Sequence, residues 1–196
     1  MSSIINCSLI TGIYPDQLKV AKVCPIYKSD SKDKFSNYRP ISLLPSFSKI
    51  FEKVVFDRIF CYLNSKKILN DNQYGFRKNH STYMAILDMQ NKITAAMDRY
   101  EYAVGIFIDL SKAFDTLDHH ILLKKMQHYG IRGLALSWLT SYLSNRVQYV
   151  VIDNTVSCMM QITCGVPQAS ILGPLLFILY INDIVESSNI TIYTVC

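Results

Sequence analysis

Apolar residues recur along this chain with the spacing of helices in several places. The run ILGPLLFILYI at 171–181 is too short to span a bilayer and carries a Gly-Pro break, so we expect it to form a core helix. Four other segments are also expected to be helical: 45–69, 82–100, 119–130 and 133–145. We expect Ser46 or Ser48 to cap the start of the first segment, and the third to end at Gly130.

Patterns typical of strands alternate with these helices. AVGIFIDL at 103–110 is apolar throughout, so it is expected to be a central strand that ends in Asp109. This mixed order predicts an α/β (α+β) fold in which helices cover a sheet. The other expected segments are a strand over 20–26, polar loops over 28–40 and 70–81, a hairpin over 146–165 turning at Asp153-Asn154, and a strand over 189–196.

Composition indicates a folded globular chain. The 196 residues are 50% hydrophobic and 18% charged, which suits one or two domains and excludes a disordered chain. The first residues, MSSIINCSLITG, lack the basic start and apolar block of a secretory signal. Six scattered cysteines without a CxxC pair argue against zinc and disulfides, so we expect an intracellular protein, cytoplasmic or nuclear.

Charge divides the chain into two unequal halves. Residues 1–100 hold fifteen Lys/Arg against eight Asp/Glu, whereas residues 101–196 hold five against seven. A basic half beside a slightly acidic one suits a protein that binds a polyanion with one part and cations with the other. Uneven charge also arises by chance, so the division alone does not establish a nucleic-acid partner.

Three aspartates at the end of the predicted central strand raise the question of a metal site. A buried carboxylate needs a hydrogen bond, a cation or a metal, and Asp109 lies where α/β sheets place ligand chemistry. On position alone we favour a turn-capping role for it. Asp118 is expected to cap the next helix and Asp115 to be a turn residue. The nearby histidines expected to be solvated are His119, His120 and His128.

Two further stretches carry candidate binding chemistry. Residues 165–177, GVPQASILGPLLF, place a glycine, a proline, an amide and a hydroxyl where they can meet a nucleotide or a base edge. An ordinary helix-entry turn fits this composition equally well. Lys28 and Arg39 flank the polar loop at 28–40, and Arg77 follows an aromatic residue. Such cations suit phosphate binding and base stacking, although each alone is most simply a solvated charge.

Four blocks taken in order are more specific than any one of them. They are LKVAKVCPIYKSDSKDKFSNYRPISLLPSFSKIFEKVV, QYGFRKNHST, GIFIDLSKAFDTLDHHILL and GVPQASILGPLLFILYINDI. In this order they resemble the reverse transcriptase of LINE-type (non-LTR) retrotransposons, from about residue 4 to about residue 183. The resemblance implies a right-hand polymerase fold, with fingers over 1–100, a partial palm over 101–196 and no thumb. It also implies an RNA template, a DNA primer and a deoxynucleoside triphosphate as partners, and no membrane is expected.

The resemblance assigns roles to individual residues. Asp109 matches the first catalytic carboxylate, a ligand of two Mg²⁺ ions in phosphoryl transfer, with the carbonyl of Leu110 nearby. Phe114 matches the bulky residue that packs under the incoming sugar and rejects a 2′-hydroxyl. Lys28 and Arg39 match residues that hold the triphosphate, and Arg77 remains a candidate for substrate binding. The loop that lines the nucleotide and the template is matched by Gly165, Pro167, Gln168 and Ser170.

The chain departs from the family at two places. The family carries adjacent aspartates in a Tyr/Phe-Ala-Asp-Asp motif, but Val195 and Cys196 stand there after the matching Tyr193, and no acidic residue follows Glu186. Ala169 stands where the family usually has glycine, so a positive φ there would strain the loop. We expect a catalytically incomplete polymerase fragment. The alternatives are a non-enzymatic nucleic-acid-binding remnant and a decayed retrotransposon product.

Overall fold

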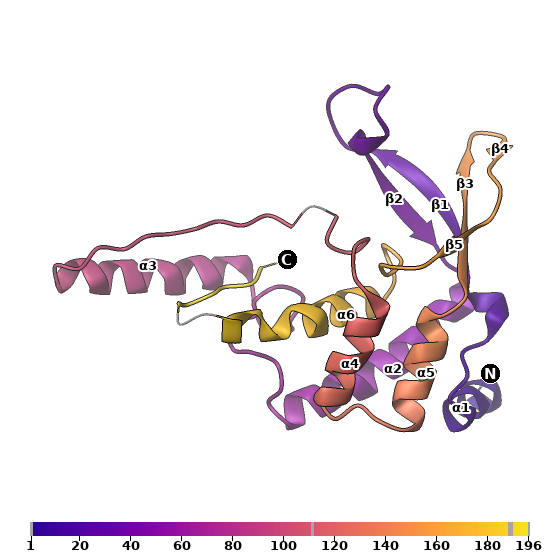
Figure 1. The fold of residues 1–196 in the computed structure, drawn as a ribbon, viewed down its shortest axis with the longest axis horizontal. Helices are drawn as coiled ribbons and strands as arrows, with labels where there is room; N and C mark the ends of the chain where they lie inside the picture. The colour runs from indigo at the N-terminus through magenta and orange to yellow at the C-terminus, as the bar shows by residue number, and fades with distance from the viewer. Residues whose placement is uncertain (1, 111, 188–189, 196) are drawn as a thin grey trace.

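The structure, a computed structural model, describes residues 2–110, 112–187 and 190–195. These residues form six α-helices, five β-strands and three short 3₁₀ helices (Figure 1). The helices are α1 (Ser2–Thr11), α2 (Ser46–Ser65), α3 (Thr82–Asp98), α4 (His119–His128), α5 (Leu134–Leu143) and α6 (Leu172–Ile181). The strands are β1 (Val20–Tyr27), β2 (Tyr38–Leu43), β3 (Arg146–Ile152), β4 (Thr155–Val156) and β5 (Met160–Ile162), and the 3₁₀ helices are Asp16–Leu18, Phe35–Asn37 and Asn182–Ser187.

A small mixed sheet lies to one side of the helices (Figure 1). Its strand order is β2-β1-β3-β4, and β5 also pairs with β3. β1 and β2 form an antiparallel hairpin in which Tyr27 pairs with Tyr38. β1 and β3 run parallel, with Val20 opposite Val147. The β1–β2 hairpin projects away from the helices, so its tip, residues 28–37, is surrounded by solvent.

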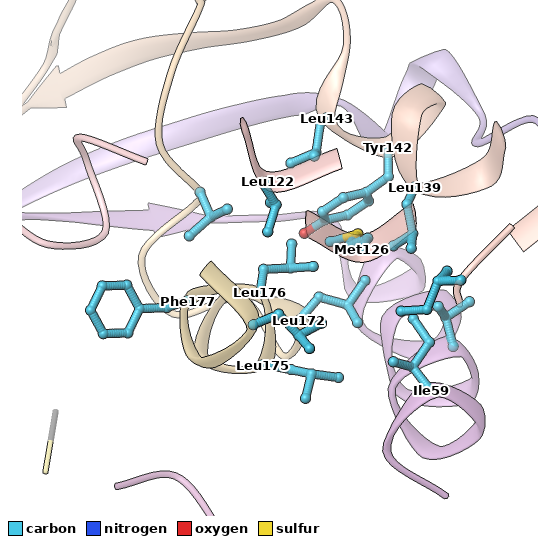
Figure 2. Packing of buried hydrophobic residues seen from close by; sticks show 14 of the residues in the cluster. Ile59, Leu122, Met126, Leu139, Tyr142, Leu143, Leu172, Leu175, Leu176 and Phe177 are labelled. Atoms are coloured by element: carbon cyan, nitrogen blue, oxygen red, sulfur yellow. The ribbon is translucent and has the colours of Figure 1, made fainter. Parts of the chain in front are cut away.

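Helix α6 lies at the centre of the core. Its sequence is apolar on every side, which is typical of a helix buried all round, and eight of its ten residues are buried. α2 and α4 pack against it, and α5 packs against α4. Figure 2 shows Leu172 and Leu176 in one cluster with Ile59 of α2, Met126 of α4 and Leu139 of α5. The core helix predicted at this position is confirmed.

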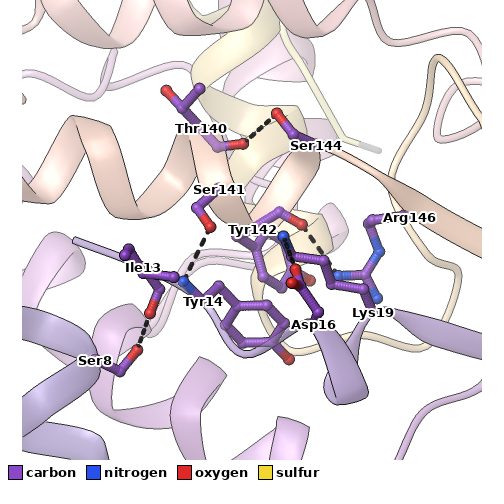
Figure 3. A network of polar contacts seen from close by, with 10 residues as sticks. All are labelled: Ser8, Ile13, Tyr14, Asp16, Lys19, Thr140, Ser141, Tyr142, Ser144 and Arg146. Carbon is purple, nitrogen blue, oxygen red and sulfur yellow. Dashed lines mark hydrogen bonds and ion pairs between the residues drawn. The ribbon is translucent and has the colours of Figure 1, made fainter. Parts of the chain in front are cut away.

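The segment between α1 and β1, which contains Tyr14, connects the sheet to the helices. Tyr14 packs edge-on against Trp138 with ring centroids 5.2 Å apart. Its backbone N–H donates to Ser141 Oγ over 3.0 Å (Figure 3). Arg146, at the start of β3, is fully buried and donates to the carbonyl of Tyr142 over 3.1 Å. Burial raises the pKa of Tyr142 well above its usual value. These contacts fix the base of the sheet relative to α5.

Most predicted elements lie where the sequence places them, and the mixed α/β class is confirmed. α2, α3, α4 and α5 fall within their predicted ranges, and Gly130 follows α4 with a φ of +88°. β1 matches the strand expected at 20–26, and β3 and β4 form the hairpin that turns at Asp153-Asn154. No helix in the described part of the chain is long and apolar enough to cross a membrane.

The central strand predicted at 103–110 is wrong. These residues are exposed and belong to no strand, with Phe107 84% and Ile108 78% accessible. An apolar run becomes a strand only where a neighbour supplies hydrogen-bonding partners, and no backbone bond joins 103–110 to the rest of the described chain. Together with α3 it forms an arm, residues 82–110, that extends away from the core (Figure 1).

The start of α2 also differs from the prediction. Neither Ser46 nor Ser48 caps this helix, because Pro45 occupies the cap position and makes no side-chain bond there. Ser48 instead points into the core, where its hydroxyl donates to Glu52 Oε1 over 2.8 Å. A serine near a helix start therefore serves tertiary packing here.

Two other segments differ in extent from their predictions. β2 begins at Tyr38, inside the polar loop expected over 28–40, because β1 supplies its hydrogen-bonding partner. The strand expected over 189–196 begins and ends outside the described residues. Its described part makes a single β-bridge, between Thr194 and Gln73, and forms no strand.

Candidate functional site

Two segments far apart in the sequence pack together near the base of the β1–β2 hairpin. They are the glycine loop, residues 164–170, and the aspartate turn, residues 112–118. The N–H of Gly165 donates to the carbonyl of Leu117 over 2.7 Å. Gly165 has a φ of +78°, and a Cβ there would lie 2.7 Å from the carbonyl oxygen of Asp115. Only glycine allows this close approach of the two backbones.

Gln168 joins the glycine loop to its neighbours on both sides. Its side-chain Nε2 donates to Asp115 Oδ1 over 2.9 Å, and its carbonyl accepts from the N–H of Ser42 in β2 over 3.2 Å. Asp115 is the turn residue that the sequence predicts, and its carboxylate also orients the amide of Gln168. The hairpin, the glycine loop and the aspartate turn are thus connected by hydrogen bonds.

Phe114 is half-buried and held from two sides. Its ring lies 5.1 Å from that of Phe177 in α6 and 6.0 Å, edge-on, from that of Phe76, measured between centroids. Its carbonyl accepts from the N–H of Val166 over 2.8 Å. The bulky residue singled out from the sequence therefore sits on a fixed backbone against the core helix.

The end of the glycine loop is closed by bonds within the chain. Ser170 is buried, its hydroxyl donates to the carbonyl of Pro167 over 2.7 Å, and it accepts from the N–H of Gly173 over 3.0 Å. This hydroxyl is therefore occupied at the start of α6. Ala169, just before it, has a φ of +72°, the strained conformation that the sequence raised as a possibility.

The acidic residue behind this loop is Glu52, which the sequence pattern did not single out. It is fully buried on α2, and its Oε2 accepts from the N–H groups of Ile171 (2.7 Å) and Leu172 (3.2 Å). Free N–H groups at a helix start need such acceptors, so α2 caps α6 across the core. The available signal was a carboxylate on the apolar face of a predicted helix, three positions before Val55.

The first turn of α4 also contacts the glycine loop. The expectation that His119 is solvated is wrong: it is half-buried, and its Nε2 donates to the carbonyl of Gly165 over 2.6 Å. The predicted cap is confirmed, because Asp118 Oδ1 accepts from the N–H of Ile121 over 2.8 Å. This hydrogen bond lowers the pKa of the Asp118 carboxyl below its usual value.

The three predicted basic residues separate into two places. Lys28 and Arg39 are both exposed on the β1–β2 hairpin, at either end of its tip. Arg77 lies in another loop and is half-buried, and its guanidinium donates to the carbonyl of Asn70 over 2.6 Å. The structure therefore brings Lys28 and Arg39 onto one exposed element and ties Arg77 to its own loop.

Asp109 stands apart from these groups. It is exposed in the extended end of the arm, followed by the 42% accessible Leu110, and it bonds to no described residue. Within the described ranges, no three His, Cys, Asp or Glu residues lie close enough together to hold a metal ion. Mg²⁺ is usually bound by carboxylates together with substrate phosphates, so the residues placed here do not by themselves form its site. The metal-binding roles of Asp109 and Leu110 stay predictions.

Comparison with known proteins relates this arrangement to a family. Residues 26–195 match the family model described as reverse transcriptase (RNA-dependent DNA polymerase). The chain is 35% identical over 191 residues to the probable RNA-directed DNA polymerase from transposon BS of Drosophila melanogaster, covering 94% of this chain and 20% of that protein. It is 34% identical to the RNA-directed DNA polymerase from the mobile element jockey of the same organism, covering 97% and 21%. The chain thus spans about a fifth of the length of these curated relatives.

Proposed function

Because the chain belongs to the reverse transcriptase (RNA-dependent DNA polymerase) family, we propose that it supplies the fingers and part of the palm of a LINE-type RNA-directed DNA polymerase. Residues 1–100 are the fingers in this proposal and 101–196 part of the palm. The observation that supports this proposal is that hydrogen bonds connect the β1–β2 hairpin, the glycine loop and the aspartate turn. The resemblance assigns these segments to the triphosphate, the template and the incoming nucleotide.

The exposed hairpin provides the nucleic-acid contact in this proposal. Lys28 and Arg39 are exposed, so they are free to meet phosphates of an RNA template, a DNA primer or a nucleoside triphosphate. In this proposal, the nucleotide is lined by the loop that β2 holds in place, which carries Gly165, Pro167 and Gln168. Binding through such cations releases counterions and weakens as salt rises.

The same geometry argues against complete catalysis by the 196-residue chain. Family members generally use divalent metal ions, and nucleotidyl transfer needs carboxylates that hold them at the attacking and leaving oxygens. Among the described residues, Asp109 belongs to no group of three His, Cys, Asp or Glu residues close enough together to hold a metal ion. We therefore propose that this chain binds nucleic acid without extending a primer.

Titration of a labelled single-stranded RNA at several salt concentrations tests the binding. The logarithm of the association constant should fall linearly with that of the salt concentration, and Lys28→Ala or Arg39→Ala should each reduce the slope by about 0.7. Lys124→Ala is the matched control, because this exposed lysine lies on α4, away from the hairpin (Figure 1). A flat salt dependence, or no binding at low salt, would refute the proposal.

Primer extension on a poly(A) template tests the catalytic half. We expect no product with either Mg²⁺ or Mn²⁺, because losing charge stabilisation of the transferring phosphate costs thousands-fold or more in rate. Asp109→Ala controls for a contaminating polymerase. Extension by the natural chain that Asp109→Ala abolishes would show that the chain completes its own catalytic site.

A further inference from the structure

The tip of the β1–β2 hairpin presents one aromatic side chain to solvent. Phe35 is 90% accessible, more than any other phenylalanine in the described chain. It opens the 3₁₀ turn Phe35–Asn37 and packs against no other aromatic ring of the described chain. Burying a phenyl ring stabilises a folded protein, but this ring stays in contact with water. It therefore contributes little to the free energy of unfolding.

The loop that carries Phe35 is ordered without its help. The N–H of Lys28 donates to the carbonyl of Asn37 over 2.8 Å, closing the base of the tip. The side chain of Asn37 donates to the carbonyl of Ser31 over 2.7 Å, and the Tyr38 hydroxyl to that of Lys32 over 2.9 Å. A loop already fixed by such bonds loses little entropy when a ligand binds it.

Positive charge surrounds the exposed ring. Lys28, Lys32, Lys34 and Arg39 are exposed within seven positions of Phe35, and none forms an ion pair with another described residue. The opposing acids on this tip are Asp30 and Asp33, so residues 28–39 keep a net charge of +2. An exposed aromatic ring on a loop with a net positive charge matches a phosphate chain that carries flat bases.

We propose that Phe35 is a stacking residue for an unpaired base of a single-stranded nucleic acid, with the surrounding cations holding the adjacent phosphates. A single strand fits because its bases expose their faces, whereas a duplex offers them only at its ends. The inference rests on the nucleic-acid binding proposed above, and it adds a contact that carries affinity without adding charge.

Salt dependence separates the two contributions. Phe35→Ala should weaken binding of a single-stranded RNA oligonucleotide roughly 5- to 150-fold, the range measured for loss of one stacked base, and leave the salt slope unchanged. Lys34→Ala should instead lower the slope by about 0.7. Phe35→Trp should retain binding, whereas Phe35→Leu, which keeps apolar area without an aromatic face, should behave like Phe35→Ala.

A base analogue reports the stacking directly. With 2-aminopurine in the oligonucleotide, the natural chain should quench its fluorescence and Phe35→Ala should not. Tyr83→Ala, which removes a 72% accessible aromatic ring from α3, is the matched control and should change neither signal. Phe35 is exposed, so its variants should keep the natural thermal transition.

The outcomes distinguish the two proposals. If Phe35→Ala binds and quenches as the natural chain does while Lys28→Ala still lowers the slope, the stacking inference is wrong and nucleic-acid binding stands. Full binding by Phe35→Leu would likewise overturn stacking. If the natural chain binds no RNA at any salt concentration, both proposals fail.

Discussion

Ala169 holds a backbone conformation that is costly for any residue with a side chain. Its φ of +72° lies in the left-handed region, where a Cβ crowds the following carbonyl at a cost of roughly 1–2 kcal/mol. Ala169→Gly should therefore raise the free energy of unfolding by about 1 kcal/mol, which urea denaturation followed by circular dichroism would measure.

The control for this prediction is the same replacement in a helix. Ala95→Gly in α3 should lower stability by about 1 kcal/mol, because glycine has poor helix propensity. If both replacements lowered the free energy of unfolding, the strain at Ala169 would not be real. This position was located through the resemblance to the family, which usually has glycine there.

Helices and hairpins were predictable because their signals are local. The spacing of apolar residues predicts α2 and α4, and the cap of α4 is predictable because Asp118 directly precedes the helix. His119 and Glu52 were misjudged or missed because their partners lie 46 and about 120 positions away. Contacts of this kind depend on how helices pack, which the residue pattern alone does not specify.

The segment at 103–110 shows the same limit for a strand. Its apolar residues favour burial in a sheet, but a strand also needs a neighbour at hydrogen-bonding distance. No such neighbour lies beside it in the described chain, so the run stays extended and Asp109 bonds to no other described residue. The candidate metal site depended on this strand, whereas the glycine loop and its turn did not.

Glu52 provides the prediction at the scale of elements, because it couples α2 to α6. Glu52→Ala should lower the free energy of unfolding by about 3 kcal/mol, since it leaves the buried N–H groups of Ile171 and Leu172 without an acceptor. Asp57→Ala on the same helix should cost less than about 1 kcal/mol, because its pair with Lys53 is exposed. Equal losses in urea denaturation would contradict this role of Glu52.

The whole molecule combines a well-packed helical core with an arm that is largely uncovered. Along the arm, apolar side chains on both α3 and the extended segment face solvent, including Met97 at 67% and Val104 at 87% accessible. Soluble monomers rarely leave contiguous apolar surface of this kind open, and an extended backbone with free N–H and C=O groups also invites pairing. The isolated chain should therefore associate with itself or with a partner.

Sedimentation velocity over a range of concentrations tests this expectation. The natural chain should form larger species as concentration rises, and Ile106→Lys combined with Ile108→Lys should shift it toward monomer, because charge on one face of an extended segment opposes pairing. Both side chains are more than three-quarters exposed, at 76% and 78%, so the double variant should keep its thermal midpoint. The matched control, Ile4→Lys with Ile10→Lys on exposed positions of α1, should leave association unchanged. A natural chain that stays a monodisperse monomer with a cooperative thermal transition would mean that the arm is covered in solution by the chain's own residues.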